Sequence, residues 1–199
     1  MMHPATELRL VNERIGYGVF STRAIPKGTI TWTLDALDRL IEPAELAAFP
    51  AEYRGILDKY SYRDRFGRHV LCWDHARFVN HDSDPNCLMT AYEFEIAVRD
   101  VAAGEQLTDD YGCLNVCEPF PCESGGRGRT VVQPDDLVRY HADWDGTLRR
   151  AFARFGDVDQ PLLPLLTARR RAQAIAVSRG EIEMESVLSC YFDGSVPGA

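Results

Sequence analysis

The chain has 199 residues, of which 45% are hydrophobic and 26% are charged, a composition that indicates a folded protein and excludes a disordered one. Its formal net charge is −8, which disfavours direct nucleic-acid binding and suits a basic partner, although acidity is also common among soluble proteins. The amino terminus lacks a signal-peptide pattern and no apolar run is long enough for a membrane span, so the sequence predicts an intracellular soluble protein, cytoplasmic or, in a eukaryote, nuclear.

The first seventy residues are predicted to combine short strands with a helical insert. The run "YGVFSTRAI" at 17–25 is typical of a short strand, and the turn at 26–28 follows it. Residues 42–60 have the composition of a helix, which Pro50 should break or kink. Gly67 then indicates a hairpin before the compact apolar run at 70–73.

Residues 92–99 carry a clear strand pattern, because apolar side chains at every second position alternate with Glu93 and Glu95. This period of two predicts a half-buried strand. Residues 113–133 are rich in Gly, Cys and Pro and show no periodicity. From Pro134 the pattern becomes helical, with acids near the start of the first segment and arginines near its end. The sequence thus predicts a mainly β (α+β) fold with a helical insert and a helical C-terminal tail.

Three short motifs follow one another along the chain: Gly16-Tyr17-Gly18, then "RFVNH" at 77–81, then "QLTDDYG" at 106–112. Taken singly, each also fits an ordinary structural role, as a glycine turn, a hydrogen-bonded histidine or a buried tyrosine. Their order, within "GYGVFSTRAIPKGT", "ARFVNHDSDPN" and "VRDVAAGEQLTDDYG", resembles the SET-domain family of S-adenosylmethionine-dependent protein-lysine methyltransferases. The resemblance spans roughly residues 7–112 and continues loosely to about residue 140.

The resemblance implies a β-rich fold of small sheets with a pseudoknot, in which a C-terminal stretch threads under a preceding loop. On this basis residues 1–112 are expected to form the SET domain, with the helical insert at about 42–60. Residues 113–133 are expected to form a Cys- and Gly-rich segment like the post-SET region of relatives. Residues 134–199 are expected to form a helical C-terminal extension.

The resemblance also assigns roles to seven residues. Tyr111 matches the catalytic tyrosine, which also touches the cofactor, and Asn80 and His81 match the dipeptide that faces the cofactor. Gly16, Tyr17 and Gly18 match the loop that runs along the methionine part of the cofactor. Arg77 matches an arginine that is structural or lies near the cofactor carboxylate. Tyr60 and Tyr62 remain open between a place in the lysine channel and a place in the core or on the surface.

The chemistry of methyl transfer fits these roles. A sulfonium is an activated methyl donor, so the protein has to hold the acceptor amine in line with the S–CH3 bond. An apolar channel disfavours the charged form of lysine and lowers its pKa, which provides the uncharged amine. The Tyr111 hydroxyl is expected to orient that amine and to complement positive charge through its oxygen lone pairs.

The sequence departs from the family pattern in two places. Asp109 stands where many relatives carry Phe or Tyr, so the number of methyl groups added does not follow from the resemblance. Cysteines of the zinc-binding relatives are replaced by Ser83, Ser124 and Arg129. Four thiols that suit zinc occur nearby, so one hypothesis is a relocated zinc site made of Cys87, Cys113, Cys117 and Cys122. The alternative is that they are small buried residues around an irregular loop.

The function expected from the sequence is methyl transfer from S-adenosylmethionine to a lysine of a protein, in a basic lysine-containing segment. One alternative is a catalytically silent SET module that binds a peptide or partner, and another is methylation of a small molecule or a different amino group. The sequence leaves the substrate, the methylation degree and the oligomeric state open.

Overall fold

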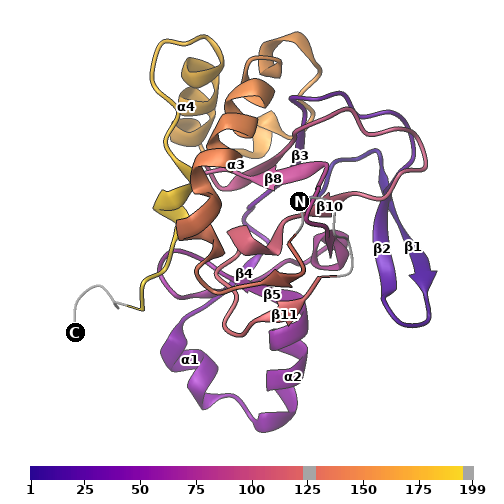
Figure 1. Cartoon of the computed structure of the whole chain (residues 1–199), viewed down its shortest axis with the longest axis vertical. Coiled ribbons are helices and arrows are strands. Elements are labelled where there is room, and N and C mark those ends of the chain that lie inside the picture. The colour runs from indigo at the N-terminus through magenta and orange to yellow at the C-terminus, as the bar shows by residue number, and fades with distance from the viewer. Residues whose placement is uncertain (123–128, 195–199) are drawn as a thin grey trace.

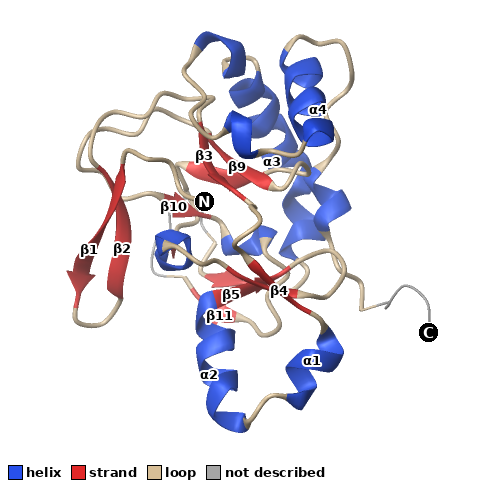
Figure 2. Cartoon of the chain, turned by 180° about the vertical axis from the view of Figure 1, so that it is seen from behind, coloured by secondary structure: helices blue, strands red, loops and turns tan. Residues whose placement is uncertain are grey.

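The computed structural model describes residues 1–122 and 129–194, which form an α+β fold with five small sheets among them (Figure 1). The first sheet is the antiparallel hairpin of β1 (Thr6–Asn12) and β2 (Gly16–Ser21). Both views show this hairpin projecting from one side of the molecule (Figures 1 and 2). The first motif, Gly16-Tyr17-Gly18, therefore lies at the start of β2.

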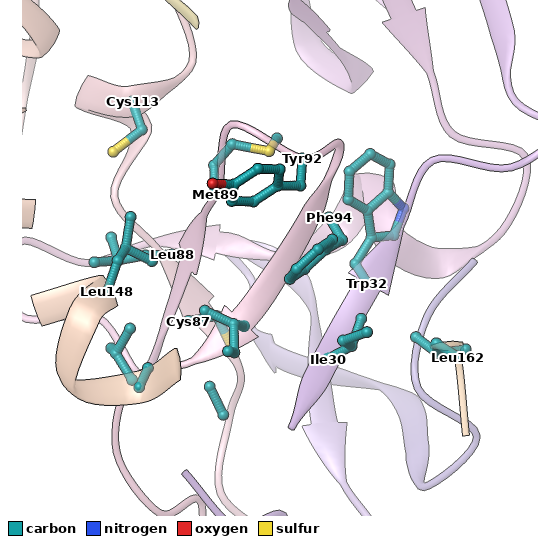
Figure 3. Close-up of a cluster of buried hydrophobic side chains, with 14 of the residues drawn as sticks. Ile30, Trp32, Cys87, Leu88, Met89, Tyr92, Phe94, Cys113, Leu148 and Leu162 are labelled. Carbon is teal, nitrogen blue, oxygen red and sulfur yellow. The ribbon is translucent and has the colours of Figure 1, made fainter. Parts of the chain in front are cut away.

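The central sheet is antiparallel and has the order β3-β9-β8, with strands Ile30–Thr33, Phe94–Ala97 and Cys87–Met89. Every residue of these strands is buried. The prediction of a half-buried strand at 92–99 is therefore wrong, because Glu95 of β9 is only 9% exposed. Both faces of this sheet are buried, in part by the apolar core that includes Trp32 and Phe94 (Figure 3).

A second three-stranded sheet has the order β4-β6-β5, with strands Arg39–Ile41, His69–Leu71 and Ser61–Arg63. The helices α1 (Pro43–Ala48) and α2 (Ala51–Tyr60) are inserted between β4 and β5. Pro50 is the N-cap of α2 and separates the two helices, as predicted. The loop between β5 and β6 contains Gly67 at a φ of +76°, a conformation that glycine adopts without strain.

The two remaining motifs meet in a short parallel sheet. Strand β7 (Asn80–His81) pairs with β10 (Thr108–Asp109), so that Asn80 lies opposite Thr108 and His81 opposite Asp109. The 3-10 helix η1 (His75–Phe78) precedes β7. The 3-10 helix η2 (Tyr111–Cys113) follows β10, and the side chain of Asp110 caps it by accepting from the Gly112 N–H. This pairing positions Tyr111 beside His81.

The C-terminal part packs onto the same core. After the small sheet of β11 (Phe120–Pro121) and β12 (Val131–Val132), α3 runs over Asp136–Phe152 and α4 over Ala168–Ser178. Short 3-10 helices complete this part: η3 (Phe155–Asp157), η4 (Leu163–Leu165) and η5 (Val187–Cys190). One face of α3 is buried in the core through Leu137, Trp144, Leu148 and Phe152. Among the described residues, no helix has the length and apolar character of a membrane span.

Candidate functional site

A cavity of about 580 Å³ lies next to the motifs of β7, β10 and η2. Its lining runs from exposed to fully buried side chains. The exposed lining residues form what we call the cavity mouth: Asp58, Lys59, Arg77, Cys117 and Glu118. Seven lining residues are less than a tenth exposed: Val79, Asn115 and five that form what we call the cavity floor, namely Met2, Trp32, Cys72, Glu95 and Asp109. Tyr60, Tyr62 and Tyr111 are among the other lining residues. The structure thus places Tyr60 and Tyr62, whose location the sequence left undecided, in the cavity wall.

Tyr111 is held by two hydrogen bonds. Its hydroxyl donates to the Val79 carbonyl at 2.6 Å, and its backbone N–H donates to His81 Nδ1 at 3.2 Å. Burial and the nearby carboxylates of Asp109 and Glu95 raise the pKa of Tyr111, so the hydroxyl stays protonated at neutral pH. Because its proton is committed to Val79, the lone pairs of the oxygen are available to a group in the cavity.

His81 is neutral and fixed in orientation. Burial lowers its pKa, an effect that the nearby Asp110 carboxylate opposes. Since Nδ1 accepts from the Tyr111 N–H, Nε2 carries the proton and donates to the Cys122 sulfur at 3.2 Å. The imidazole ring also contacts Phe120, with ring centroids 5.6 Å apart. His81 thereby ties the Asn-His motif to both the tyrosine and the segment after it.

Asn80 holds the glycine motif. Its Nδ2 donates to the Tyr17 carbonyl at 3.1 Å. A Cβ on Gly18 would lie 2.9 Å from that same Nδ2, so only glycine permits this approach. Gly16 has a φ of +84°, and apart from its two chain neighbours no described residue has an atom within 4 Å of the place where its Cβ would be. The backbone at Gly16 is therefore open to a ligand.

Tyr17 and Arg77 both contact the ring of Phe78. The Tyr17 ring contacts Phe78 edge-on at 6.2 Å, and the Arg77 guanidinium lies 5.4 Å from the Phe78 centroid. Arg77 also donates to the Cys72 carbonyl at 3.4 Å and lines the cavity mouth. These contacts join β2 to η1.

The close approach at Gly18 gives a stability prediction. Gly18→Ala should lower the free energy of unfolding by about 1–3 kcal/mol, because its new methyl group has to displace the Asn80 amide or its neighbours. The matched control is Gly55→Ala in α2, where nothing lies within 4 Å and a gain of about 0.5–1 kcal/mol is expected. Urea unfolding of both variants is the measurement, and equal stability of Gly18→Ala and wild type would contradict the packing described.

Within the described residues, the four cysteines of the zinc hypothesis do not gather at one centre. Cys87 and Cys113 lie among the buried apolar side chains (Figure 3), and burial raises the pKa of both thiols. Cys117 is exposed, whereas Cys122 contacts His81. Over residues 1–122 and 129–194, no three His, Cys, Asp or Glu side chains gather as metal ligands. Cys87 and Cys113 act as small core residues, the alternative given above.

Arg129 joins η2 to α3. Its guanidinium pairs with Asp110, directly before Tyr111, and with Asp136 at the start of α3, where the second distance is 3.0 Å. The Arg129 side chain is 11% exposed, and both carboxylates are buried. The resemblance places a cysteine of zinc-binding relatives at this position, and here the position holds an arginine in two ion pairs. Ser124, the neighbouring departure from the family pattern, lies outside the described residues.

The region that contains these motifs matches a known protein family. Residues 16–112 match the protein-family model of the SET domain. The chain contains a SET domain. Its SET domain begins at Gly16 of β2 and ends within η2, so it includes the glycine motif, the Asn-His motif and Tyr111.

A curated relative is the histone-lysine N-methyltransferase ASHR3 of Arabidopsis thaliana, which is 26% identical over 160 residues. The match covers 71% of this chain and 31% of that protein, so the chain spans about a third of the relative's length. A crystal structure of a candidate histone methyltransferase from Plasmodium falciparum is 19% identical, with a TM-score of 0.40. That match covers 55% of this chain and 95% of the other.

Two buried acids of the SET domain were not predicted as site residues. The alternating pattern placed Glu95 on the polar face of a strand, and such a position does not indicate that a residue lines a cavity. Asp109 had one signal, its occurrence at a position where relatives carry an aromatic residue. The structure brings both side chains into the lining of the cavity that also contains Tyr111.

Proposed function

We propose that this protein is an S-adenosylmethionine-dependent methyltransferase that modifies a lysine side chain of a protein. The observation that carries the proposal is the arrangement of Tyr111, whose hydroxyl is held by Val79 in the wall of the cavity and whose backbone is held by His81. One residue thus connects a deep acceptor cavity to the Asn-His motif. In this proposal residues 1–112 carry the chemistry, the segment 113–133 borders it, and the extension 134–199 supports it.

The residues around the glycine motif fit the cofactor. The open backbone at Gly16 admits the methionine part of a ligand, and the Asn80 side chain retains Oδ1 and a second N–H for it. Bound S-adenosylmethionine would supply an electrophilic methyl group. On the protein's side, His81 and Asn80 fix the geometry of this motif, and Tyr111 presents its lone pairs to the acceptor amine.

The acceptor is proposed to be a lysine in a basic segment. The cavity passes from an exposed mouth to a buried floor, which suits one extended side chain, and the net charge of −8 attracts a basic chain. The name of the relative in Arabidopsis thaliana points to histones as one source of such a segment. A silent peptide-binding module is the second candidate, but such a module has no use for a tyrosine hydroxyl held in this way.

Binding of S-adenosylmethionine should depend on the Asn-His motif. Asn80→Ala and His81→Ala are each expected to weaken binding by about 1–3 kcal/mol, since each change removes a hydrogen bond that orders the motif. Titration calorimetry on the folded variants is the measurement. His141→Ala on α3 is the matched control and should bind as wild type does. Wild-type affinity in the Asn80→Ala, His81→Ala double variant would overturn the cofactor assignment.

Activity is tested with S-adenosylmethionine labelled in the methyl group, a lysine peptide array and a cell extract. A mass increase on a lysine of a protein supports the proposed function. Label that appears only in small molecules supports the alternative acceptor, and cofactor binding without any transfer supports the silent module.

A further inference from the structure

The cavity floor contains polar atoms without partners. Asp109 is 1% exposed, and its Oδ2 has no hydrogen-bond partner among the described residues. The indole N–H of Trp32, also buried, has no partner within residues 1–122 and 129–194 either. Both residues line the cavity, as does the buried Glu95. Unpaired polar atoms deep in a protein are costly, so this floor is built to meet a polar group that enters the cavity.

The two acids interact with each other. Burial raises the pKa of Glu95 to about 7, an effect that the amino group of Met1 opposes in part. Burial, then Glu95 and Asp110, raise the pKa of Asp109, whereas the backbone amides of Asp110 and Met89 oppose the rise. Two carboxyl groups in one buried space resist joint ionisation, so the pair retains protons near neutral pH when no cation is present.

The basic side chains of the cavity do not neutralise this pair. Among the described residues, no ion pair joins Asp109 or Glu95 to a Lys, Arg or His side chain. The other charged or histidine side chains of the lining are Asp58, Lys59, Arg63, His69, Arg77 and Glu118. Lys59 and Arg77 lie at the exposed mouth. Among the described residues, the two floor acids therefore have no ion pair with a lysine, arginine or histidine side chain, and the cation that acts on Glu95 is the Met1 amino group, which itself pairs with Asp35 at 2.8 Å.

We infer that Asp109 and Glu95 select an acceptor side chain that enters the cavity as a cation, and that its binding displaces a proton from the pair. The inference rests on the proposed function and specifies the acceptor that the cavity admits. A lysine ammonium and an arginine guanidinium share the required chemistry. For lysine, passage of a proton from the bound ammonium to the Asp109 carboxylate yields a neutral amine and a neutral carboxyl group, the state that methyl transfer needs. An apolar channel would instead favour a neutral side chain.

Small probes test this without any cofactor. We expect n-butylammonium and n-propylguanidinium to bind the full chain about tenfold more tightly at pH 6.5 than at pH 5.5, because the ionised fraction of the pair rises about tenfold over that range. Above about pH 7.5 the affinity should level off. The neutral probe 1-butanol should bind equally at every pH. The relative affinities of the two cations identify which side chain the floor prefers, and carboxyl ¹³C NMR follows the ionisation of the pair.

Asp109→Asn keeps the shape of the side chain and removes its charge. It should weaken binding of the cations at least about tenfold and leave 1-butanol unchanged, and Glu95→Gln provides a second variant with the same expectation. Glu181→Gln, an exposed glutamate outside the cavity lining, is the control and should change neither. The inference fails if the cations bind no better than 1-butanol at pH 8, if their affinity is the same at pH 5.5 and 7.5, or if both floor variants bind them as wild type does.

The proposed function is measured separately, by S-adenosylmethionine binding and methyl transfer in wild type. If the wild-type protein methylates lysine but shows no preference for the cationic probes, only the inference about Asp109 and Glu95 is contradicted. If the protein binds the cations with the expected pH dependence but does not bind S-adenosylmethionine, the proposed function is contradicted and the cation site is supported.

Discussion

Tyr111→Phe should reduce methyl transfer at least about tenfold, a barrier increase near 1.4 kcal/mol, while binding of S-adenosylmethionine largely persists. The substitution keeps the ring and removes only the hydroxyl. That hydroxyl donates to the Val79 carbonyl and, in the proposed function, presents its lone pairs to the acceptor amine. The His81 hydrogen bond is made by the Tyr111 backbone and is unaffected by the change. The loss should therefore appear in turnover and not in cofactor affinity.

Two measurements separate these effects. Single-turnover methyl transfer reports the chemical step, and calorimetry reports cofactor binding in the same preparation. Tyr140→Phe on α3 is the matched control: its ring packs edge-on against Trp144, and loss of its hydroxyl should leave turnover unchanged. Equal turnover in Tyr111→Phe and wild type would place the catalytic oxygen elsewhere.

Arg129→Ala should lower the free energy of unfolding by about 3–5 kcal/mol, because it leaves Asp110 and Asp136 buried without their shared cation. The guanidinium also lies 5.6 Å from the centroid of the Tyr140 ring, and the substitution removes this cation–π interaction as well. Since Asp110 caps the 3-10 helix that contains Tyr111, the variant should also lose activity. Urea unfolding at pH 7 is the measurement.

The matched control for this change is Arg139→Ala, which breaks an exposed ion pair with Asp135 and should cost less than about 1 kcal/mol. The stability gap between Arg129→Ala and wild type should narrow as the pH falls from 7 to about 4. Buried unpaired carboxyls have a folded-state pKa above the unfolded value, so protonation favours the folded variant and relieves its penalty. A loss no larger than that of Arg139→Ala would show that the Arg129 ion pairs contribute little.

The spacing of the cysteines along the chain does not determine whether they bind a metal. Cys87 lies between the second and third motifs and Cys113 directly follows the third, and the sequence left zinc and core packing as open alternatives. Whether four thiols point toward one centre depends on how several loops return to each other. In the structure two of the four are in the core and one is exposed. Arg129 could not be recognised either, because its partners are contributed by η2 and α3.

What the sequence determined by itself was local or carried by short motifs. The order of the three motifs indicated the SET domain. Pro50 divided the insert into two helices because proline cannot continue a helix, and Gly67 indicated a hairpin because glycine adopts turn conformations without strain. The tertiary structure alone decided the environment of the acids. A period of two fixes which side chains share a face of a strand, but not whether that face meets water. Because β9 is covered on both faces, Glu95 became part of the cavity floor with Asp109.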